Sequence, residues 1–351
     1  MTSSKVCGRQ RRYTETTDTD VTSGESARAA PSPGSSTGAR GGLPESPAGV
    51  PIAYLLFLII AFAAGVWVFQ DALRRLPPER PRFEAALWGL GVLVPFTLPI
   101  FLPLYLLGAR SPDPSGTWGL AEMVGIAVYF ALTLPLVAEL AGVLDGPLHL
   151  SELSGLILLQ NLGFVALAVF GIAYRYRLPV ERLGLSAPRP VPLALLGLLL
   201  GGAMVPVAVW AEEVAIFLVG LVEGHAQAAA RAVAEHAQDP LAAVVAGAHG
   251  WRLAWLLVLL AGVVPLGEEV YFRGVIYGGL RARWGPRWAT AGSALLFAAV
   301  HQQVIHALPI LLLGVVLAVV YGRTGSLLPP IVIHAVNNVV AVLGRLYGWD
   351  F

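Results

Sequence analysis

The sequence predicts an all-α fold: a polytopic transmembrane helical bundle of about eight spans, with a disordered N-terminal tail. Of the 351 residues, 56% are hydrophobic and only 13% are charged, and the mean hydropathy is +0.70. Soluble domains carry roughly 25% charged residues, so this chain has too few polar groups to cover a globule in water. The net charge of +1 gives no basic field for binding nucleic acid.

Apolar runs long enough to cross a bilayer, about 17–25 residues, recur along the chain. Pro95, Pro99 and Pro103 interrupt the second run, because proline at that density disrupts a regular helix. The runs lie near 50–70, 86–108, 118–144, 154–174, 192–221, 251–267, 288–305, 307–322 and 328–346.

The distribution of arginine indicates which run does not cross. Basic residues in short loops mark the cytoplasmic side, and they cluster at 74–82, 175–189 and 273–287. Two runs separate the last two clusters, which places both on one side, but three runs separate the first two. The sequence therefore predicts that one segment between 86 and 144 is re-entrant or wrongly divided, and its prolines make 86–108 the candidate.

Two stretches differ from the apolar runs. Residues 1–49 are rich in Ser, Thr, Gly, Pro and Arg without an apolar period, which predicts a disordered tail. This stretch contains Cys7, the single cysteine, so the chain can form neither an internal disulfide nor a thiolate metal cluster. Residues 222–249 are Ala-rich and charged, which favours an interfacial or extramembrane helix.

Ionisable residues inside apolar spans are costly and persist mainly where they pair, face a cavity or take part in chemistry. Glu269 and Arg273 are four residues apart, so they can pair along one helical face. Glu268 points about 100° away from Glu269 around the helix. Burial without a partner would raise the pKa of the Glu268 carboxyl towards the value that a general base needs. The alternative is a helix end at the membrane surface, with its charges in water.

Two further polar sets follow in the next apolar runs. Phe297 precedes His301 by four residues, and His334 precedes Asn338 by the same spacing, which places each pair on one helical face. A histidine and an amide presented together can donate two hydrogen bonds to one oxygen. Taken singly, His301 could equally be a hydrogen-bonded core residue, and His334 with Asn338 could join neighbouring helices.

Together, one carboxylate, two imidazoles and one amide suit hydrolysis, with a base for water and donors for an oxyanion. They would also suit a metal site with two histidines and a carboxylate, although the order does not match the compact His-Glu-x-x-His zinc motif. Glu212 and Glu213 form a second acid pair without a following arginine. We interpret that pair as structural or interfacial, with substrate-channel lining as the alternative.

The order and spacing of these residues, about 30 residues between successive motifs, resemble the CAAX-protease and bacteriocin-processing family of intramembrane endopeptidases. This family includes the eukaryotic prenyl-protein protease and abortive-infection proteins. The motifs are Glu268-Glu269-x-x-x-Arg273, Phe297-x-x-x-His301 and His334-x-x-x-Asn338. The resemblance covers about 251–346 and implies a membrane domain over 118–351. Residues 50–110 would be added membrane segments of unknown role.

The resemblance implies a role for each position. Glu268 would be the general base that activates water, assisted by His301, and His334 with Asn338 would stabilise the oxyanion. Glu269 and Arg273 would be the supporting pair, and Phe297 would shape the site. A glutamate mechanism without a cofactor is favoured, with zinc on Glu268, His301 and His334 as the alternative.

The expected substrate is a hydrophobic or lipidated peptide or protein tail. Membrane lipid is the other expected partner, and nucleic acid is not one. The single lysine among 23 basic residues is typical of a GC-rich bacterial genome, so we expect an integral protein of a bacterial cytoplasmic membrane. A proton-coupled transporter that uses the same acids and histidines, or a catalytically silent immunity or scaffold protein, are the competing hypotheses.

Overall fold

The computed structural model describes residues 52–77, 79–94, 97–113, 116–140, 149–237 and 244–348. Every regular element in these ranges is helical, which confirms the predicted all-α class. The N-terminal half contains α1 (Ile52–Arg75), α2 (Phe83–Leu93), α3 (Leu98–Leu104), the π-helix η1 (Tyr105–Ala109), α4 (Leu120–Leu140), α5 (Leu150–Ala168), the π-helix η3 (Val169–Tyr174) and the 3₁₀ turn η4 (Val180–Leu183). The predicted tail at 1–49, with Cys7, lies outside the described residues.

The second half carries the predicted motifs. It contains α6 (Pro190–Glu223), α7 (His225–Ala237), α9 (Gly250–Val258), the π-helix η5 (Leu259–Val263), α10 (Val264–Glu269), the π-helix η6 (Val270–Tyr277), α11 (Gly278–Val300), α12 (Ala307–Thr324) and α13 (Leu328–Tyr347).

Six helices of the described part are long and apolar enough to cross a membrane, judged by length and composition. They cover Leu120–Glu139, Leu150–Tyr174, Pro190–Glu223, Gly250–Val300, Ala307–Thr324 and Leu328–Tyr347. The fourth is 51 residues long, more than twice the roughly 20 residues that a span needs. Its path breaks at Gly285, where φ is 80° and ψ is 176°. It therefore has room for the two separate runs predicted from the sequence, and the predicted total of about eight is approximate.

The segment 86–108 does not form one regular helix. α2 ends at Leu93, and α3 with η1 resumes at Leu98. Arg110, directly after η1, binds Asp71 near the C-terminal end of α1, and the Ser111 N–H donates to the Arg75 carbonyl. The segment thus begins and ends beside the same end of α1, as a re-entrant helical hairpin does. The break between Leu93 and Leu98 agrees with the interruption expected from the prolines, and re-entry into the membrane stays a prediction.

This hairpin accounts for the odd number of apolar runs between the first two arginine clusters. Because 86–108 returns to the end of α1, only α4 and α5 separate the first two basic clusters. The 110–113 segment contacts members of all three basic clusters. Arg175 donates to the Leu106 and Arg110 carbonyls, and Arg283 lies 3.9 Å from Asp113. The three clusters therefore lie at one end of the bundle.

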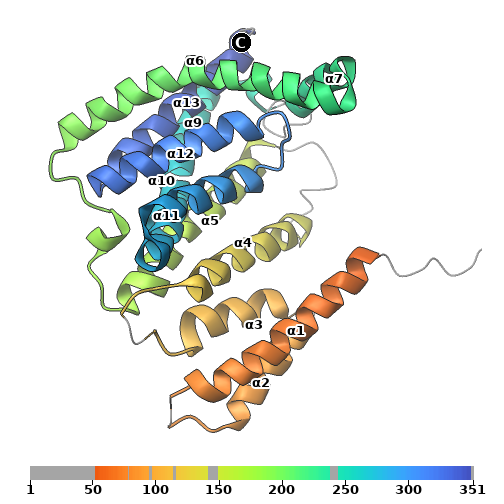
Figure 1. Ribbon diagram of the computed structural model, residues 1–351, viewed down its shortest axis with the longest axis vertical. Coiled ribbons are helices and arrows are strands. Elements are labelled where there is room, and N and C mark those ends of the chain that lie inside the picture. Colours follow the sequence, from red (N-terminus) through yellow and green to blue (C-terminus); the bar gives the residue numbers. More distant parts are fainter. Residues whose placement is uncertain are drawn as a thin grey trace, which may run out of the picture. The chain divides into compact units, whose positions relative to one another are not determined.

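The motif-bearing helices α10 and η6 lie at the centre of this packing. All eight residues of η6 are buried, and η6 contacts α5, α11 and α12. Helices α11, α12, α13 and α6 lie next to one another in that order (Figure 1). By contrast, α1 and α6 expose large apolar side chains such as Phe62 and Leu199. Patches of this kind are rare on soluble proteins and suit contact with lipid.

The π-helical segments provide acceptors for bonds between helices. In η1, η5 and η6, a backbone carbonyl accepts a side-chain N–H or O–H from another element. Arg175 donates to Leu106 in η1, Asn338 to Leu260 in η5, and Ser293 and Trp118 to Phe272 and Val275 in η6. Single π turns are frequent at functional sites, and η5 and η6 flank the acid pair. Within the stretch 222–249, for which the sequence predicts a helix, residues 225–237 form α7, and its interfacial position stays a prediction.

Candidate active site

The two adjacent glutamates at the end of α10 have different surroundings. Glu269 is fully buried, and its Oε1 accepts a hydrogen bond of 2.9 Å from Arg273 Nη1. The Glu268 side chain is 14% exposed and lines a cavity. Because the two residues are offset by about 100° around the helix, the Glu269 carboxylate lies in the interior and the Glu268 side chain lies at the cavity. Glu269 pairs with Arg273, as their four-residue spacing predicts.

Arg273 is fully buried and has three kinds of partner. Besides Glu269, its Nη2 donates to the Gly314 carbonyl over 3.3 Å, and its guanidinium lies 4.5 Å from the centre of the Phe297 ring. An unpartnered buried guanidinium would be very unfavourable, whereas here a carboxylate, a carbonyl and an aromatic face share the charge. The cluster fixes α10, η6, α11 and α12 around one cation.

His334 joins both glutamates. Its Nδ1 lies 3.0 Å from Glu269 Oε1, and its Nε2 lies 3.9 Å from Glu268 Oε2. A carboxylate accepts, so Nδ1 carries the proton of the shorter contact. Glu269 therefore orients the imidazole, and the second ring nitrogen faces Glu268. The sequence alone does not predict this contact, because 65 positions separate the two residues and no local pattern encodes it.

Phe297 and His301 occupy the end of α11. The His301 Nδ1 donates to the Phe297 carbonyl over 2.7 Å, which leaves Nε2 for other partners. The Phe297 ring packs edge-on against both histidines, with centroids 4.9 Å from His301 and 5.7 Å from His334. Gln302 adopts a φ of 55°, a left-handed conformation that is uncommon without glycine. This turn ends α11 directly after His301.

Asn338 lies one turn after His334 on α13. Its Nδ2 donates to the Leu260 carbonyl of η5 over 2.7 Å. One of the two amide N–H groups is thereby used to hold α13 against η5, and the other remains for a further acceptor. The structure thus brings Glu268, Glu269, Arg273, Phe297 and His334 into one connected group. His301 shares the cavity with Glu268, and Asn338 adjoins the group through its helix.

A cavity of about 600 Å³ opens beside Glu268 and His301. Its walls are mostly apolar side chains of α4, α5, η6 and α11. Tyr271 and Phe164 stack with ring centroids 4.6 Å apart and line it. Tyr271 stands inside the first motif, so its position was the only signal in the sequence. Other lining residues include Met123, Phe130, Leu134, Gln160, Phe272 and Val300.

Each of the two glutamates has one carboxylate oxygen without a hydrogen bond. Glu268 Oε2 is buried and has no hydrogen-bond partner among the described residues, and the same holds for Glu269 Oε2. Buried polar atoms are nearly always paired with protein or water. Glu268 differs from Glu269 in that its side chain borders the cavity, while its Oε2 faces His334 Nε2 over 3.9 Å.

The donor set does not fit a metal ion in this arrangement. Within the described ranges, no three His, Cys, Asp or Glu side chains gather closely enough to hold one. The His334 Nδ1 faces Glu269, and the His301 Nδ1 is held by a backbone carbonyl.

Comparison with known proteins identifies the segment that contains this group. Residues 250–340 match the family described as type II CAAX prenyl endopeptidase Rce1-like. This match agrees with the resemblance of the three motifs to the CAAX-protease and bacteriocin-processing family. The matched residues include all seven motif positions, and with six apolar helices the chain is an integral membrane protein.

A curated relative agrees with the family match. The Bacillus subtilis (strain 168) protein named "Putative membrane peptidase YdiL" is 30% identical over 92 residues, which are 26% of this chain and 38% of that protein. The match thus spans little more than a third of the relative's length. No solved structure matches the chain significantly.

Proposed function

We propose that this protein is an intramembrane endopeptidase that cleaves a peptide bond in a hydrophobic or lipid-modified peptide or protein tail. The observation that carries the proposal is Glu268, whose side chain lines the cavity and whose Oε2 has no hydrogen bond and lies 3.9 Å from an imidazole that Glu269 holds through its other ring nitrogen. The family match over the same residues supports it.

Glu268 takes a proton from a water molecule, and the water oxygen attacks the scissile carbonyl carbon. The protonated Glu268 then delivers that proton to the leaving amine, so the carboxylate is regenerated. A base of this kind contributes about 10²–10⁴-fold to the rate. His301 borders the same cavity and assists by holding the water through Nε2.

Charge balance favours a donor role for His334. Two carboxylates and one guanidinium form the buried group, so a proton on the imidazole makes the group neutral and gives Nε2 an N–H. That N–H, with the second amide N–H of Asn338, stabilises the oxyanion in a setting from which water is largely excluded. The glutamate mechanism is thereby favoured over a zinc mechanism.

The cavity suits an apolar substrate. Apolar side chains, most of them from α4, η6 and α11, outnumber the polar groups that line it, and Glu268 is among those polar groups. A hydrophobic or prenylated chain would bury its apolar part against these apolar side chains, at roughly 25 cal/mol per Å² of area removed from water, and present its backbone to Glu268.

The test is cleavage of a fluorogenic prenylated peptide, and of the same peptide without its prenyl group, by purified full-length protein. Glu268→Gln is expected to lower kcat by about 10²–10⁴-fold with an unchanged melting temperature. Glu213→Gln is the matched control, because Glu213 is an exposed member of another acid pair in an apolar helix. It is expected to retain activity.

Each assay is repeated with a chelator. Activity that survives chelation and is lost in Glu268→Gln supports the glutamate mechanism. Activity that is lost to the chelator and restored by zinc would contradict it. Full activity in Glu268→Gln would overturn the assignment of the base, and wild-type protein without activity on any such peptide would favour the catalytically silent scaffold.

A further inference from the structure

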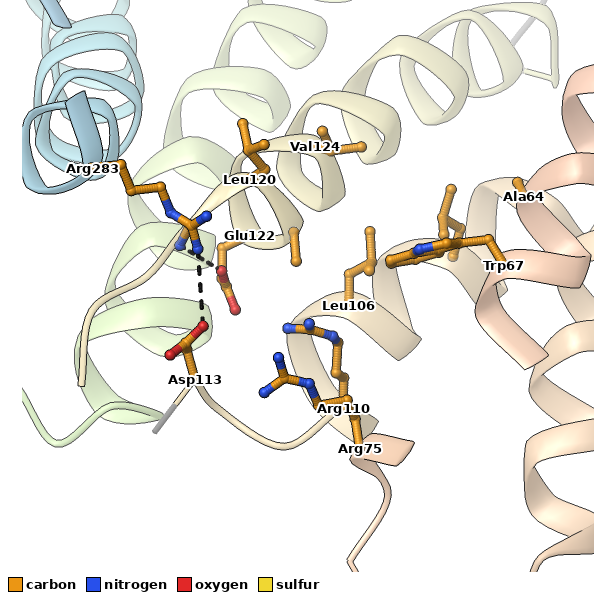
Figure 2. Close-up of a pocket in the computed structure, with 13 residues that line it drawn as sticks. Ala64, Trp67, Arg75, Leu106, Arg110, Asp113, Leu120, Glu122, Val124 and Arg283 are labelled. Carbon is orange, nitrogen blue, oxygen red and sulfur yellow. Dashed lines mark hydrogen bonds and ion pairs between the residues drawn. The ribbon is translucent and has the colours of Figure 1, made fainter. Parts of the chain in front are cut away.

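A second cavity, of about 540 Å³, lies between α1, the re-entrant hairpin, α4 and the start of α11. Figure 2 shows three arginines from different elements around it, with Arg75 and Arg110 reaching in from one side and Arg283 from the other. Two carboxylates, Asp113 and Glu122, also line it on the side of Arg283, and the rest of its wall is apolar and contains Trp67 and Leu106. It shares Leu120 and Val124 with the active-site cavity, so the two lie on either side of one stretch of α4.

The arginines around this cavity outnumber by one the carboxylates that pair with them. Arg110, which is 9% exposed, binds Asp71 over 2.7 Å, and Arg175 binds Glu122 from behind. Arg283 lies 3.9 Å from Asp113. No carboxylate within the described residues lies at ion-pair distance from the half-buried Arg75. Neighbouring cations repel one another, and an anion in the cavity would relieve this repulsion.

The apolar wall extends away from these charges. Ala64 and Arg75 both line the cavity and are eleven residues apart on α1, which corresponds to about 16 Å at the helical rise. Leu102 and Leu106 of the hairpin and Val124 of α4 complete the apolar part. A small anion would leave this part unfilled, whereas an acyl chain below an anionic headgroup would fill it.

We infer that this cavity binds one anionic phospholipid of the surrounding bilayer. Its phosphate lies between Arg75, Arg110 and Arg283, and an acyl chain lies along Trp67 and the hairpin. Arginine pairs with phosphate through several N–H groups in a fixed geometry, and anionic lipids attract basic residues at the membrane surface. The site gives the hairpin and α1 a role that is separate from peptide cleavage.

Binding is measured on the full-length protein in a neutral detergent, by native mass spectrometry during titration with short-chain phosphatidylglycerol. Arg75→Gln is expected to weaken binding at least tenfold. Arg74→Gln is the matched control, because Arg74 is the exposed neighbour at the same helix end and does not line the cavity. Its affinity is expected to stay within twofold of wild type.

Two further arms identify the ligand. Val124→Trp fills the apolar part at a side chain that is 46% exposed, and it is expected to weaken lipid binding. Phosphatidylcholine of equal chain length and free glycerol phosphate are both expected to bind at least tenfold more weakly than phosphatidylglycerol. Unchanged binding in Arg75→Gln, an equal loss in Arg74→Gln, or glycerol phosphate that binds as tightly as the lipid would each overturn the inference.

Discussion

The two arginine-containing regions of this protein use the same side chain in opposite ways. At the motif core, Arg273 is fully buried and is shared by Glu269, a carbonyl and an aromatic ring. At the end of the bundle, Arg75 and Arg283 border an open cavity, and Arg283 remains 43% exposed on its side chain. A buried charge enclosed by its partners, even with its Nε left without a hydrogen bond, holds helices together, whereas a charge that borders an open cavity indicates a place where a ligand can bind.

The same substitution in both regions is expected to give the largest difference in the free energy of unfolding. Arg273→Met leaves Glu269 buried without its cation and is expected to lower the free energy of unfolding by about 3–5 kcal/mol. Arg283→Met removes a long, exposed ion pair and is expected to cost at most about 1 kcal/mol. Equilibrium unfolding in mixed micelles measures both, and equal losses would break the comparison.

A smaller effect is expected from the packing that holds the acid pair. A Cβ on Gly267 would lie 2.5 Å from the Cβ of Asn161 and 2.6 Å from its Cα, so α5 would have to move. Gly267→Ala is expected to cost about 1–3 kcal/mol, as overpacking does, and to lower peptidase activity by displacing Glu268.

Gly155→Ala on the same α5 is its control, because nothing lies within 4 Å of the added methyl group. This variant is expected to remain within about 0.5 kcal/mol of wild type. A Gly267→Ala protein with wild-type stability would show that α5 and α10 are not rigidly packed.

Replacement of the aromatic partner should have a smaller effect than loss of the cation. Phe297→Leu keeps much of the apolar volume but removes the ring face at Arg273 and the edge contacts to both histidines. The expected loss is about 1–2 kcal/mol, together with reduced kcat because His301 and His334 lose a shared support. A loss of stability with unchanged kcat would assign Phe297 to packing alone.

The sequence could predict the local part of this site and not its tertiary part. The Glu269–Arg273 pair follows from a four-residue spacing, and the division of 86–108 follows from its prolines. The contact between Glu269 and His334 spans 65 positions, and that between Asn338 and Leu260 spans 78. Both depend on how α13 packs against η5 and α10, which no periodic pattern encodes. No local pattern predicts the arginine cavity either, because its three cations come from separate elements.

The smallest predicted effect concerns a charge outside both regions. Glu235 on α7 accepts N–H groups of Val304 and Ile305 and lies 3.2 Å from His306. Partial burial raises the pKa of the Glu235 carboxyl, but these hydrogen bonds and the nearby His306 outweigh it and leave the pKa below its usual value. A depressed pKa stabilises the fold above the unfolded value of about 4.3, and this contribution is lost as the pH falls further.

Glu235→Gln is therefore expected to lower the melting temperature at pH 7, and to differ less from wild type at pH 3.5. Melting curves at both pH values measure the difference. His306 also lies 3.8 Å from Glu212, so Glu212→Gln serves to separate the two carboxylates. A gap between wild type and Glu235→Gln that widens in acid would contradict the assigned direction.

The π-helical segments have a consequence for the order in which the bundle assembles. A helix that inserts into hydrocarbon alone must satisfy its backbone internally, and it has no neighbour to use the carbonyls of a widened turn. In the finished bundle, Trp118 and Ser293 bind carbonyls of η6, and Asn338 binds one of η5. Regular α-helical turns are therefore expected in the newly inserted segment. The change of helical register around Glu268 then accompanies the arrival of the neighbouring helices, so the site acquires its geometry only when the bundle closes.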